Sequence, residues 1–340
     1  MKLAVVLFNL GGPDCPEAVE PFLRNLFSDP AIIALPGIFR WPLARLIAKR
    51  RAPIAGKIYD HMGGRSPIFE QTRAQANALE AALSKDGVDA KAFVAMRYWH
   101  PFSDGAARAV KAFGPDKIVL LPLYPQYSTT TTGSSLEDWA RAARKAGLGA
   151  PTSRACCYPW GSGFVAAATA KIRDAAKDLK PGLSYRLLLS AHGLPKRVIE
   201  KGDPYQWQVE QSAAAITKAL DMPQLDAVVC YQSRVGPLEW IGPSTDAEIA
   251  RAGKESKGLI VAPIAFVSEH SETLVELDIE YRKLAAEKGV ADYRRAATVG
   301  THPDFIEGLA GLVRRAVDGK TVTCSDGRVC PAMHKRCGYN

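Results

Sequence analysis

The chain has 340 residues, a length typical of two domains of ordinary size. Hydrophobic residues make up 47% of it and charged residues 23%, which excludes disordered and collagen-like proteins. The net charge of +9 favours an acidic small molecule or anionic lipid as partner, and no nucleic-acid-binding motif accompanies it. No apolar run is long enough to span a membrane. Residues 1–10 are expected to form a strand rather than a signal peptide, so we predict a cytoplasmic protein.

Short apolar, β-branched runs alternate with helical segments along the chain. This alternation is typical of parallel sheets that are covered by helices on both faces. We therefore predict an α/β protein with two Rossmann-like domains, residues 1–150 and 151–310, and an active-site cleft between them. Residues 311–340 are predicted to contain the end of a C-terminal helix and a cysteine-rich tail. The predicted strands are residues 3–8, 90–95, 117–121, 185–189, 227–230 and 259–264, and the clearest helices are residues 71–84 and 208–220.

The segment 31–51 is unusually apolar and ends in a basic cluster. One interpretation is a buried core helix with a charged end, although two internal prolines disfavour a long helix. Apolar and aromatic side chains beside arginines are also typical of a segment that lies in a membrane interface. A third interpretation is a wall of a pocket for a large, flat, apolar ligand. The segment alone leaves these alternatives open.

Ligands of open α/β sheets bind beyond the carboxyl ends of the strands. Three histidines, His100, His192 and His270, follow predicted strands at such positions. A neutral imidazole can accept a proton near pH 7 or ligate a divalent metal, and we take His192 as the best candidate for this chemistry. Glu272 adds a hard carboxylate, and a mixed histidine–carboxylate pair suits Fe²⁺.

Glu272, Glu276 and Glu280 are spaced four residues apart, on one face of a predicted helix. They form either a solvated acidic face or a row of carboxylates that passes cations or protons from the expected crevice. The chain has no P-loop and no GxGxxG motif, and Gly11-Gly12-Pro13 is too short for a dinucleotide fingerprint. We therefore expect neither ATP nor NAD as a cofactor.

Nine short motifs follow one another along residues 1–315. They are Asn9-Leu-Gly-Gly-Pro13, Lys49-Arg-Arg-Ala-Pro53, Gly63-Gly-Arg-Ser-Pro-Ile68, Met96-Arg-Tyr-Trp-His-Pro101, Tyr124-Pro-Gln-Tyr-Ser128, Leu189-Ser-Ala-His-Gly-Leu-Pro195, Gly202-Asp-Pro-Tyr205, Gln232-Ser-Arg-Val-Gly-Pro237 and Glu272-Thr-Leu274. In their order and spacing the chain resembles the ferrochelatases, which insert Fe²⁺ into protoporphyrin to make haem. The resemblance implies a chelatase-type fold, protoporphyrin IX and Fe²⁺ as substrates, and the release of two protons.

The resemblance also implies roles for individual residues. His192 matches the family's essential histidine, which accepts pyrrole protons or contacts Fe²⁺, and Glu272 matches its acidic partner. Glu276 and Glu280 match further acidic residues that relay protons or metal along the same helix. The segment 31–51 resembles a pocket lip that also touches the inner membrane from the cytoplasm. The residues that would contact the macrocycle are Leu10, Arg50 or Arg51 (near a propionate), Arg97, Tyr98, Tyr124 and Trp240.

The cysteines depart from the pattern of the animal ferrochelatases. Those enzymes carry a ligand of a [2Fe–2S] cluster directly after the Tyr-Pro-Gln-Tyr-Ser motif, where this chain has Thr129. The tail instead carries three cysteines in a segment rich in Gly, Lys and Arg, and a metal centre would give such a tail structure. We predict a [2Fe–2S] cluster held by Cys324, Cys330, Cys337 and Cys156 (or Cys157). Zn²⁺, with His334 replacing a thiolate, and cysteines without metal remain alternatives.

Other functions also remain open at this point. A chelatase of the same architecture could use coproporphyrin as the macrocycle or Co²⁺ as the metal. A non-catalytic haem or iron carrier would need the pocket but no base. The sequence does not decide between a monomer and a homodimer.

Overall fold

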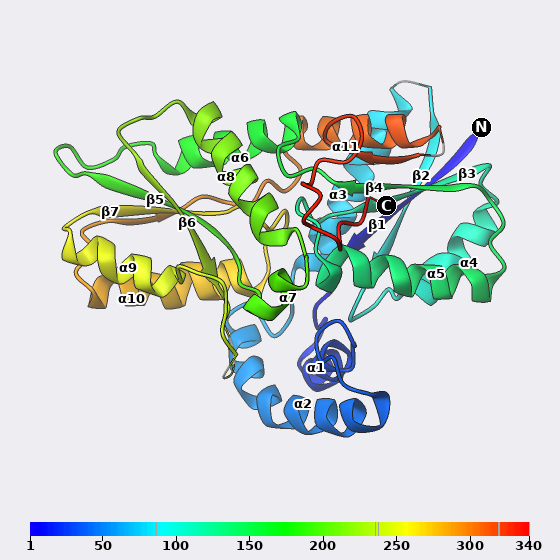
Figure 1. Cartoon of the computed structure of the whole chain (residues 1–340), viewed down its shortest axis with the longest axis horizontal. Helices are drawn as coiled ribbons and strands as arrows, with labels where there is room; N and C mark the ends of the chain where they lie inside the picture. Colours follow the sequence, from blue (N-terminus) through cyan, green and yellow to red (C-terminus); the bar gives the residue numbers. More distant parts are fainter. Residues whose placement is uncertain (86, 235, 237, 319, 340) are drawn as a thin grey trace. The chain divides into compact units, whose positions relative to one another are not determined.

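The computed structural model describes residues 1–85, 87–234, 236, 238–318 and 320–339, so Val235 and Pro237 of the 232–237 motif lie outside the described residues. The chain forms two compact units, both drawn in Figure 1. Unit 1 contains Met1–Cys157, Leu309–Thr323 and Tyr339, and unit 2 contains Tyr158–Gly308 and Cys324–Gly338.

Unit 1 is built on a parallel sheet with the strand order β2-β1-β3-β4-β9. Strand β1 lies between β2 and β3, and its residues 3–8 form an uninterrupted apolar run that is at most 1% exposed, as expected of a strand covered on both faces. The strands are β1 (Lys2–Asn9), β2 (Asp89–Met96), β3 (Lys117–Pro122), β4 (Thr152–Cys157) and β9 (Thr321–Thr323).

Helices cover the sheet of unit 1. Helices α4 and α5 lie side by side (Figure 1), and Trp139 of α5 packs its ring edge-on against Phe8 of β1. Helices α1 and α2 pack together around a second apolar cluster that includes Phe22 and Tyr98. The helical segments are η1 (Pro16–Ala18), α1 (Val19–Phe27), α2 (Gly37–Asp60), α3 (Ile68–Ser84), α4 (Ser103–Phe113), η2 (Thr129–Gly133) and α5 (Ser134–Ala146).

Helix α2 contains most of the apolar 31–51 segment. It is 24 residues long and continues through Pro42 and Pro53. Only its small residues on one side, such as Ala44 and Ala48, are fully buried. At its start the side chains of Ile38, Phe39 and Trp41 are 75%, 65% and 65% exposed. The interpretation of this segment as a buried core helix is therefore wrong.

Unit 2 contains a second parallel sheet, with the order β6-β5-β7-β8. In Figure 1, α9 and α10 lie on one face of this sheet, and α6 and α8 lie on the other. Both sheets place the first strand of the unit between its second and third strands. The elements are β5 (Tyr185–His192), β6 (Asp226–Gln232), β7 (Gly258–Pro263), β8 (Tyr293–Arg295), α6 (Ser162–Ala175), α7 (Lys196–Glu200), α8 (Tyr205–Leu220), α9 (Thr245–Lys254), η3 (Glu272–Glu280), α10 (Tyr281–Glu287) and α11 (Pro303–Ala316), whose residues belong to both units.

All six predicted strands and both predicted helices are confirmed as β1, β2, β3, β5, β6, β7, α3 and α8. The prediction omitted β4, β8 and β9. Strands β8 and β9 have only three residues each, and β4 begins with a polar run, so none shows the long apolar pattern of a central strand.

Candidate active site

The fold of unit 2 brings several polar residues to one edge of its sheet. Strand β5 ends at His192 and its neighbour β6 ends at Gln232. The neighbour on the other side, β7, leads through a loop into the helix η3, which begins at Glu272. Because β5 lies between β6 and β7, this edge is the point of the sheet where open α/β folds bind their ligands.

His192 and Glu272 form a hydrogen-bonded pair at this edge. His192 Nδ1 lies 2.8 Å from Glu272 Oε2, and the two side chains are 37% and 23% exposed. Burial alone lowers the pKa of His192, but the Glu272 carboxylate outweighs it and the pKa is raised. Burial alone raises the pKa of Glu272, but His192 outweighs it and lowers that pKa to about 2. The pair therefore favours an imidazolium beside a carboxylate.

Glu276 lies one turn further along η3 and is held by residues from the end of β6. The Ser233 backbone N–H donates to Glu276 Oε1 at 2.8 Å, and the Ser233 hydroxyl donates to Glu276 Oε2 at 2.5 Å. Gln232 Nε2 also donates to Glu276 Oε2, at 3.0 Å, and the Tyr281 hydroxyl donates to Oε1 at 3.1 Å. Burial and then the neighbouring Glu272 raise the pKa of Glu276 despite these donors. The ionised carboxylate of Glu272 thus lies beside the carboxyl group of Glu276, which keeps its proton to higher pH.

The helix η3 is a π-helix, a rare form that is frequent at functional sites. Its wider turn keeps residues four apart close to one face. Arg295 of β8 holds its other side, with Nε and Nη2 donating to Asp278 at 2.9 and 2.6 Å and Nη1 donating to Glu269 at 2.7 Å. Glu280 lies exposed at the last position of η3, away from the buried part of the row.

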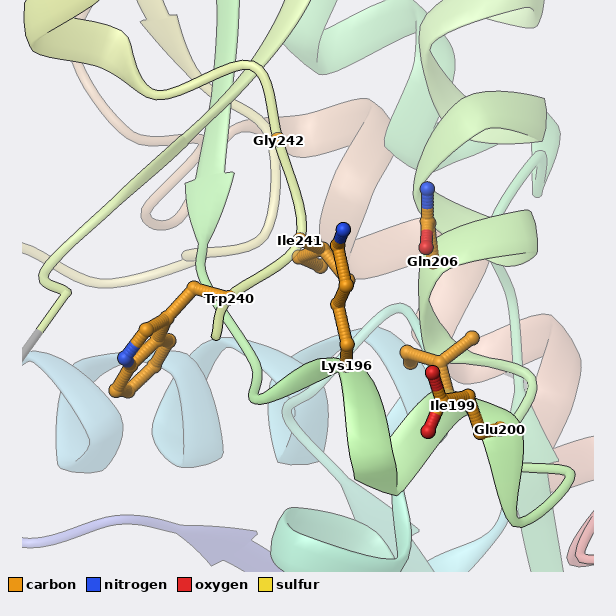
Figure 2. A pocket seen from close by; sticks show the side chains of 7 residues that line it. All are labelled: Lys196, Ile199, Glu200, Gln206, Trp240, Ile241 and Gly242. Atoms are coloured by element: carbon orange, nitrogen blue, oxygen red, sulfur yellow. The ribbon is translucent and has the colours of Figure 1, made fainter. Parts of the chain in front are cut away.

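Trp240 packs against the backbone next to His192. A side chain at Gly193 would place its Cβ 3.2 Å from Trp240 Cε3 and 3.0 Å from the Gln232 carbonyl oxygen, so this close approach favours glycine. Beside Trp240 lies an open pocket of about 460 Å³. Figure 2 shows that the Trp240 indole points away from Lys196 and Ile199, which also line this pocket. The pocket is lined by Lys196, Ile199, Glu200, Gln206, Trp240, Ile241 and Gly242.

In unit 1, Arg97 and Tyr98 follow strand β2 and share the buried carboxylate of Asp29. Arg97 Nη2 and the Tyr98 hydroxyl donate to Asp29 Oδ2 at 2.7 and 2.8 Å, and Ser134 also donates to this oxygen. Tyr98 is 1% exposed, and its ring lies under the Arg97 guanidinium at 4.9 Å. Asp29 thus fixes Arg97, whose side chain keeps 19% of its surface exposed.

The other candidate contacts of the macrocycle in unit 1 come from three elements. Leu10 follows β1 and is partly buried against the cluster that contains Tyr98. Tyr124 follows β3 and packs against the cluster that contains Trp139. Arg50 is exposed on α2, and Arg51 next to it is half-buried.

The cysteines of the predicted cluster are present as thiols. Cys330 and Cys337 are 5% and 6% exposed in unit 2, Cys324 is half-buried, and Cys156 and Cys157 are buried at the end of β4. Among the described residues, no three His, Cys, Asp or Glu side chains come together as a group that could hold a metal ion.

Sequence reasoning assigned no role to Ser233, Gln232, Tyr281 or Asp29. Ser233 carries the one detectable signal, since it follows a predicted strand and therefore belongs to the same sheet edge as His192. It adopts φ +61°, a conformation that is uncommon for a residue with a side chain. Asp29 shows no sequence signal, because its partners Arg97 and Ser134 are 68 and 105 residues away.

Two solved structures are similar in fold. SirB from Bacillus subtilis with Fe³⁺ aligns with a TM-score of 0.54 and 15% identity, over 93% of this chain and 96% of that chain. The sirohydrochlorin chelatase SirB of Bacillus subtilis subspecies spizizenii, in complex with cobalt, aligns with a TM-score of 0.54 and 14% identity, over 94% and 96%. This chain therefore shares the fold of these chelatases.

Sequence comparison defines the family within this class. A ferrochelatase of Caulobacter vibrioides (strain NA1000 / CB15N) is 56% identical over 339 residues, which cover 99% of this chain and 95% of the relative. A ferrochelatase of Phenylobacterium zucineum is 55% identical over 340 residues, covering 99% and 98%. The ferrochelatase family profile matches residues 2–317. The chain belongs to the ferrochelatase family, and the predicted activity, a lyase that forms protohaem by inserting iron into protoporphyrin, is confirmed at this level.

Proposed function

We propose that Fe²⁺ enters the macrocycle at the His192–Glu272 pair. Insertion of Fe²⁺ into protoporphyrin forms four iron–nitrogen bonds and releases the two protons of the pyrrole N–H groups. The reaction therefore needs a proton acceptor and a group that contacts the cation. The observation that carries the proposal is the 2.8 Å contact between His192 Nδ1 and Glu272 Oε2 at the ligand-binding edge of the sheet.

His192 is the proton acceptor in this proposal, or it contacts Fe²⁺ at the same point. The Glu272 carboxylate raises the pKa of His192, so the imidazole is a stronger base than it would be without this partner. The neutral imidazole then accepts a pyrrole proton by general base catalysis. Glu272 remains ionised above a pH of about 2 and offers a hard oxygen ligand to Fe²⁺.

Glu276 is the next group on the proton path. The Ser233 hydroxyl oxygen lies 3.1 Å from Glu272 Oε2 and 2.5 Å from Glu276 Oε2 and can donate its single hydrogen to either, so a short chain of oxygens leads away from the pair. The raised pKa of Glu276 lets this carboxyl hold a proton at a pH where Glu272 is ionised. Glu280, exposed at the end of η3, would release protons or admit metal from solvent.

Within unit 1, the proposed macrocycle contacts are Leu10, Arg97, Tyr98 and Tyr124. Within unit 2, the proposed contact is Trp240. A guanidinium of Arg50 or Arg51 would bind a propionate, because a bidentate arginine pairs well with a carboxylate. These residues are proposed because they match the family's pocket positions. All of them except Arg50 and Arg51, which belong to α2, also lie at or near the carboxyl ends of strands.

The activity is tested by adding Fe²⁺ anaerobically to the purified protein with protoporphyrin. We expect loss of porphyrin fluorescence together with the appearance of haem absorbance. Parallel assays with coproporphyrin and with Co²⁺ decide between the candidate substrates. A protein that binds protoporphyrin but forms no metalloporphyrin would be a carrier and would contradict the proposal.

The exposed start of helix α2 is the proposed site of peripheral membrane contact. Ile38, Phe39 and Trp41 project from it into solvent, and arginines lie further along the same helix. Such a combination is typical of a helix that lies in an anionic membrane interface. None of the helices in the described part of the chain has the length and apolarity needed to cross a bilayer.

Replacing Ile38, Phe39 and Trp41 together with serine is expected to reduce binding to anionic liposomes, because burial of each large apolar side chain contributes roughly 1.5–3 kcal/mol. Co-sedimentation with phosphatidylglycerol vesicles measures this loss. Serine at Met333, an exposed apolar residue of unit 2, is the control and should leave sedimentation unchanged. Unchanged sedimentation of the triple variant would contradict membrane contact through α2. If the same surface admits porphyrin, the triple variant also has a raised KM for it.

A [2Fe–2S] cluster held by Cys324, Cys330, Cys337 and Cys156 (or Cys157) remains a proposal. Its support is the thiol-rich tail, a soft donor set that suits iron–sulfur clusters or zinc. Gln208 Nε2 also donates to Cys330 Sγ at 3.0 Å, as it would to a cluster-bound sulfur. The described residues do not show an assembled ligand set, so no step of the reaction is assigned to the cluster.

We expect the protein, purified without oxygen, to be reddish and to contain two irons and two acid-labile sulfides per chain, because thiolate-bound iron absorbs visible light by charge transfer. Absorption spectra together with iron and sulfide analysis measure this. Substitution of Cys337 by serine should remove the colour, whereas serine at the exposed Cys15 should not. Colourless protein with stoichiometric zinc would instead assign the tail to a Zn²⁺ site that includes His334.

A homodimer also remains a proposal, and sedimentation equilibrium tests it.

A further inference from the structure

We propose that the C-terminal tail of unit 2, residues 324–338, positions the catalytic histidine through Tyr205. The inference rests on the proposed role of His192. It concerns a function of the tail that needs no metal: the tail braces the start of helix α8, and α8 in turn fixes the backbone of His192.

The first step is the contact between Tyr205 and His192. The Tyr205 hydroxyl donates to the His192 carbonyl oxygen at 3.0 Å, and Tyr205 is 6% exposed. This hydrogen bond reaches the last residue of β5, which pairs with Gln232 of β6 and ends the register of the two strands. A shift of Tyr205 would therefore move the His192 backbone, and with it the imidazole that contacts Glu272.

The second step is the anchoring of Tyr205 at the beginning of α8. Its backbone N–H donates to Asp203 Oδ1 at 3.0 Å, and Asp203 is completely buried. Gly202 precedes this aspartate with φ +93°, and its N–H donates to the Ile199 carbonyl at 2.8 Å. The segment 202–205 thus forms one short, tightly bonded turn between α7 and α8.

The third step is the seating of the tail on this turn. The Arg336 N–H donates to the Gly202 carbonyl at 3.1 Å. A Cβ at Gly202 would lie 3.1 Å from the Lys335 nitrogen, which is tighter than nine in ten real Cβ contacts, and φ +93° itself disfavours a side chain, so glycine suits both the turn and the close approach of the tail.

The tail also contacts the first turn of α8 itself. Gln208, one turn after Tyr205, is completely buried and donates to Cys330 Sγ at 3.0 Å. The Trp207 ring lies 5.7 Å from the His334 ring, and Trp160 both contacts Trp207 and donates to Ser325 Oγ at 3.2 Å. The tail therefore holds both the turn before α8 and its first turn, and Tyr205 lies between these two contacts.

The inside of the tail is organised to keep this shape. Arg328 Nη2 donates to the backbone carbonyls of His334 and Pro331, and the Cys337 N–H donates to the His334 carbonyl at 3.0 Å. A change at the buried Cys330 or Cys337 would deform the segment that contacts Gly202 and Gln208. The consequence at the active site would be a displaced His192, with porphyrin binding unchanged.

The experiment is a double-mutant cycle on the full chain with Gly202→Ala and Tyr205→Phe. Each single variant is expected to lower kcat about tenfold with an unchanged KM for porphyrin, because a misplaced catalytic group slows the chemical step more than it weakens binding. The double variant should be no slower than the slower single variant, since both act through one contact. Tyr185→Phe, which removes a buried hydroxyl at the opposite end of β5, is the control and should leave kcat unchanged.

Two further measurements do not depend on turnover. Trypsin should cleave after the exposed Lys335 and Arg336 faster in the Gly202→Ala variant but not in the Tyr205→Phe variant. The His192 ring resonance of selectively labelled protein, at fixed pH, should shift in both. Multiplicative losses of kcat in the double variant, or an unshifted His192 resonance in Tyr205→Phe, would overturn the proposal. If the wild type makes no metalloporphyrin, the proposed function fails, but the resonance and the cleavage rate still decide whether the tail positions His192.

Discussion

Replacement of His192 by alanine is expected to lower the turnover of Fe²⁺ insertion by a factor of about 10²–10⁴, the usual effect of losing a general base. The residue ends β5 and is the imidazole that pairs with Glu272 at this edge. Without it, two pyrrole protons must pass directly to water or to a carboxylate of much lower basicity. Steady-state haem formation measures the loss, and porphyrin binding, followed by fluorescence, should be retained.

His61→Ala is the control for this substitution, because His61 is an exposed histidine of unit 1. Its turnover should match that of the wild type. Near-normal turnover of His192→Ala would remove His192 from the mechanism. Loss of porphyrin binding in that variant would instead show that the side chain mainly holds the macrocycle.

Replacement of Glu272 by glutamine is expected to lower turnover by at least as much, because it removes both the partner of His192 and a hard ligand for Fe²⁺. The substitution keeps size and hydrogen-bonding capacity, so the protein should remain folded. It also removes the main cause that raises the pKa of His192. Burial then dominates and the pKa of His192 falls, so less of the imidazole is protonated at pH 7 than in the wild type.

Two measurements check the Glu272→Gln variant. Haem formation gives the loss of turnover, and a pH titration of the His192 ring resonance by NMR gives the direction of the pKa change. Glu287→Gln, at an exposed position of α10, is the control for both. A His192 resonance that titrates as in the wild type would mean that the pair does not exist in solution, whatever the turnover.

The architecture was predictable because its central strands are buried on both faces. Residues 3–8 and 259–262 are uninterrupted apolar runs, a pattern that indicates an internal parallel strand. In the structure these residues are at most 3% exposed. Strand β9 was not predictable, because Thr321–Thr323 is short and its position at the edge of the sheet depends on pairing with a strand far away in sequence.

The candidate site was predictable only in part. His192 and Glu272 follow strands and share motifs with a known family, so the sequence points to both. The π-helical form of η3 was not predictable, because a spacing of four residues indicates a helix without specifying its width. Besides Tyr281, the donors to Glu276 are Gln232 and Ser233, some forty residues earlier, and only the folded sheet brings these two to the carboxylate.

The pairing of β4 with β9 has a consequence for the folding of the protein during its synthesis on the ribosome. Strand β4 ends at Cys157 and its partner begins at Thr321, so nearly all of unit 2 is synthesised between them. At about 5–20 residues per second, the 164 residues from Tyr158 to Thr321 (321 − 157) take roughly 8 to 33 s to add. During this interval the edge of β4 is an open template for other nascent strands, which is the situation that favours aggregation.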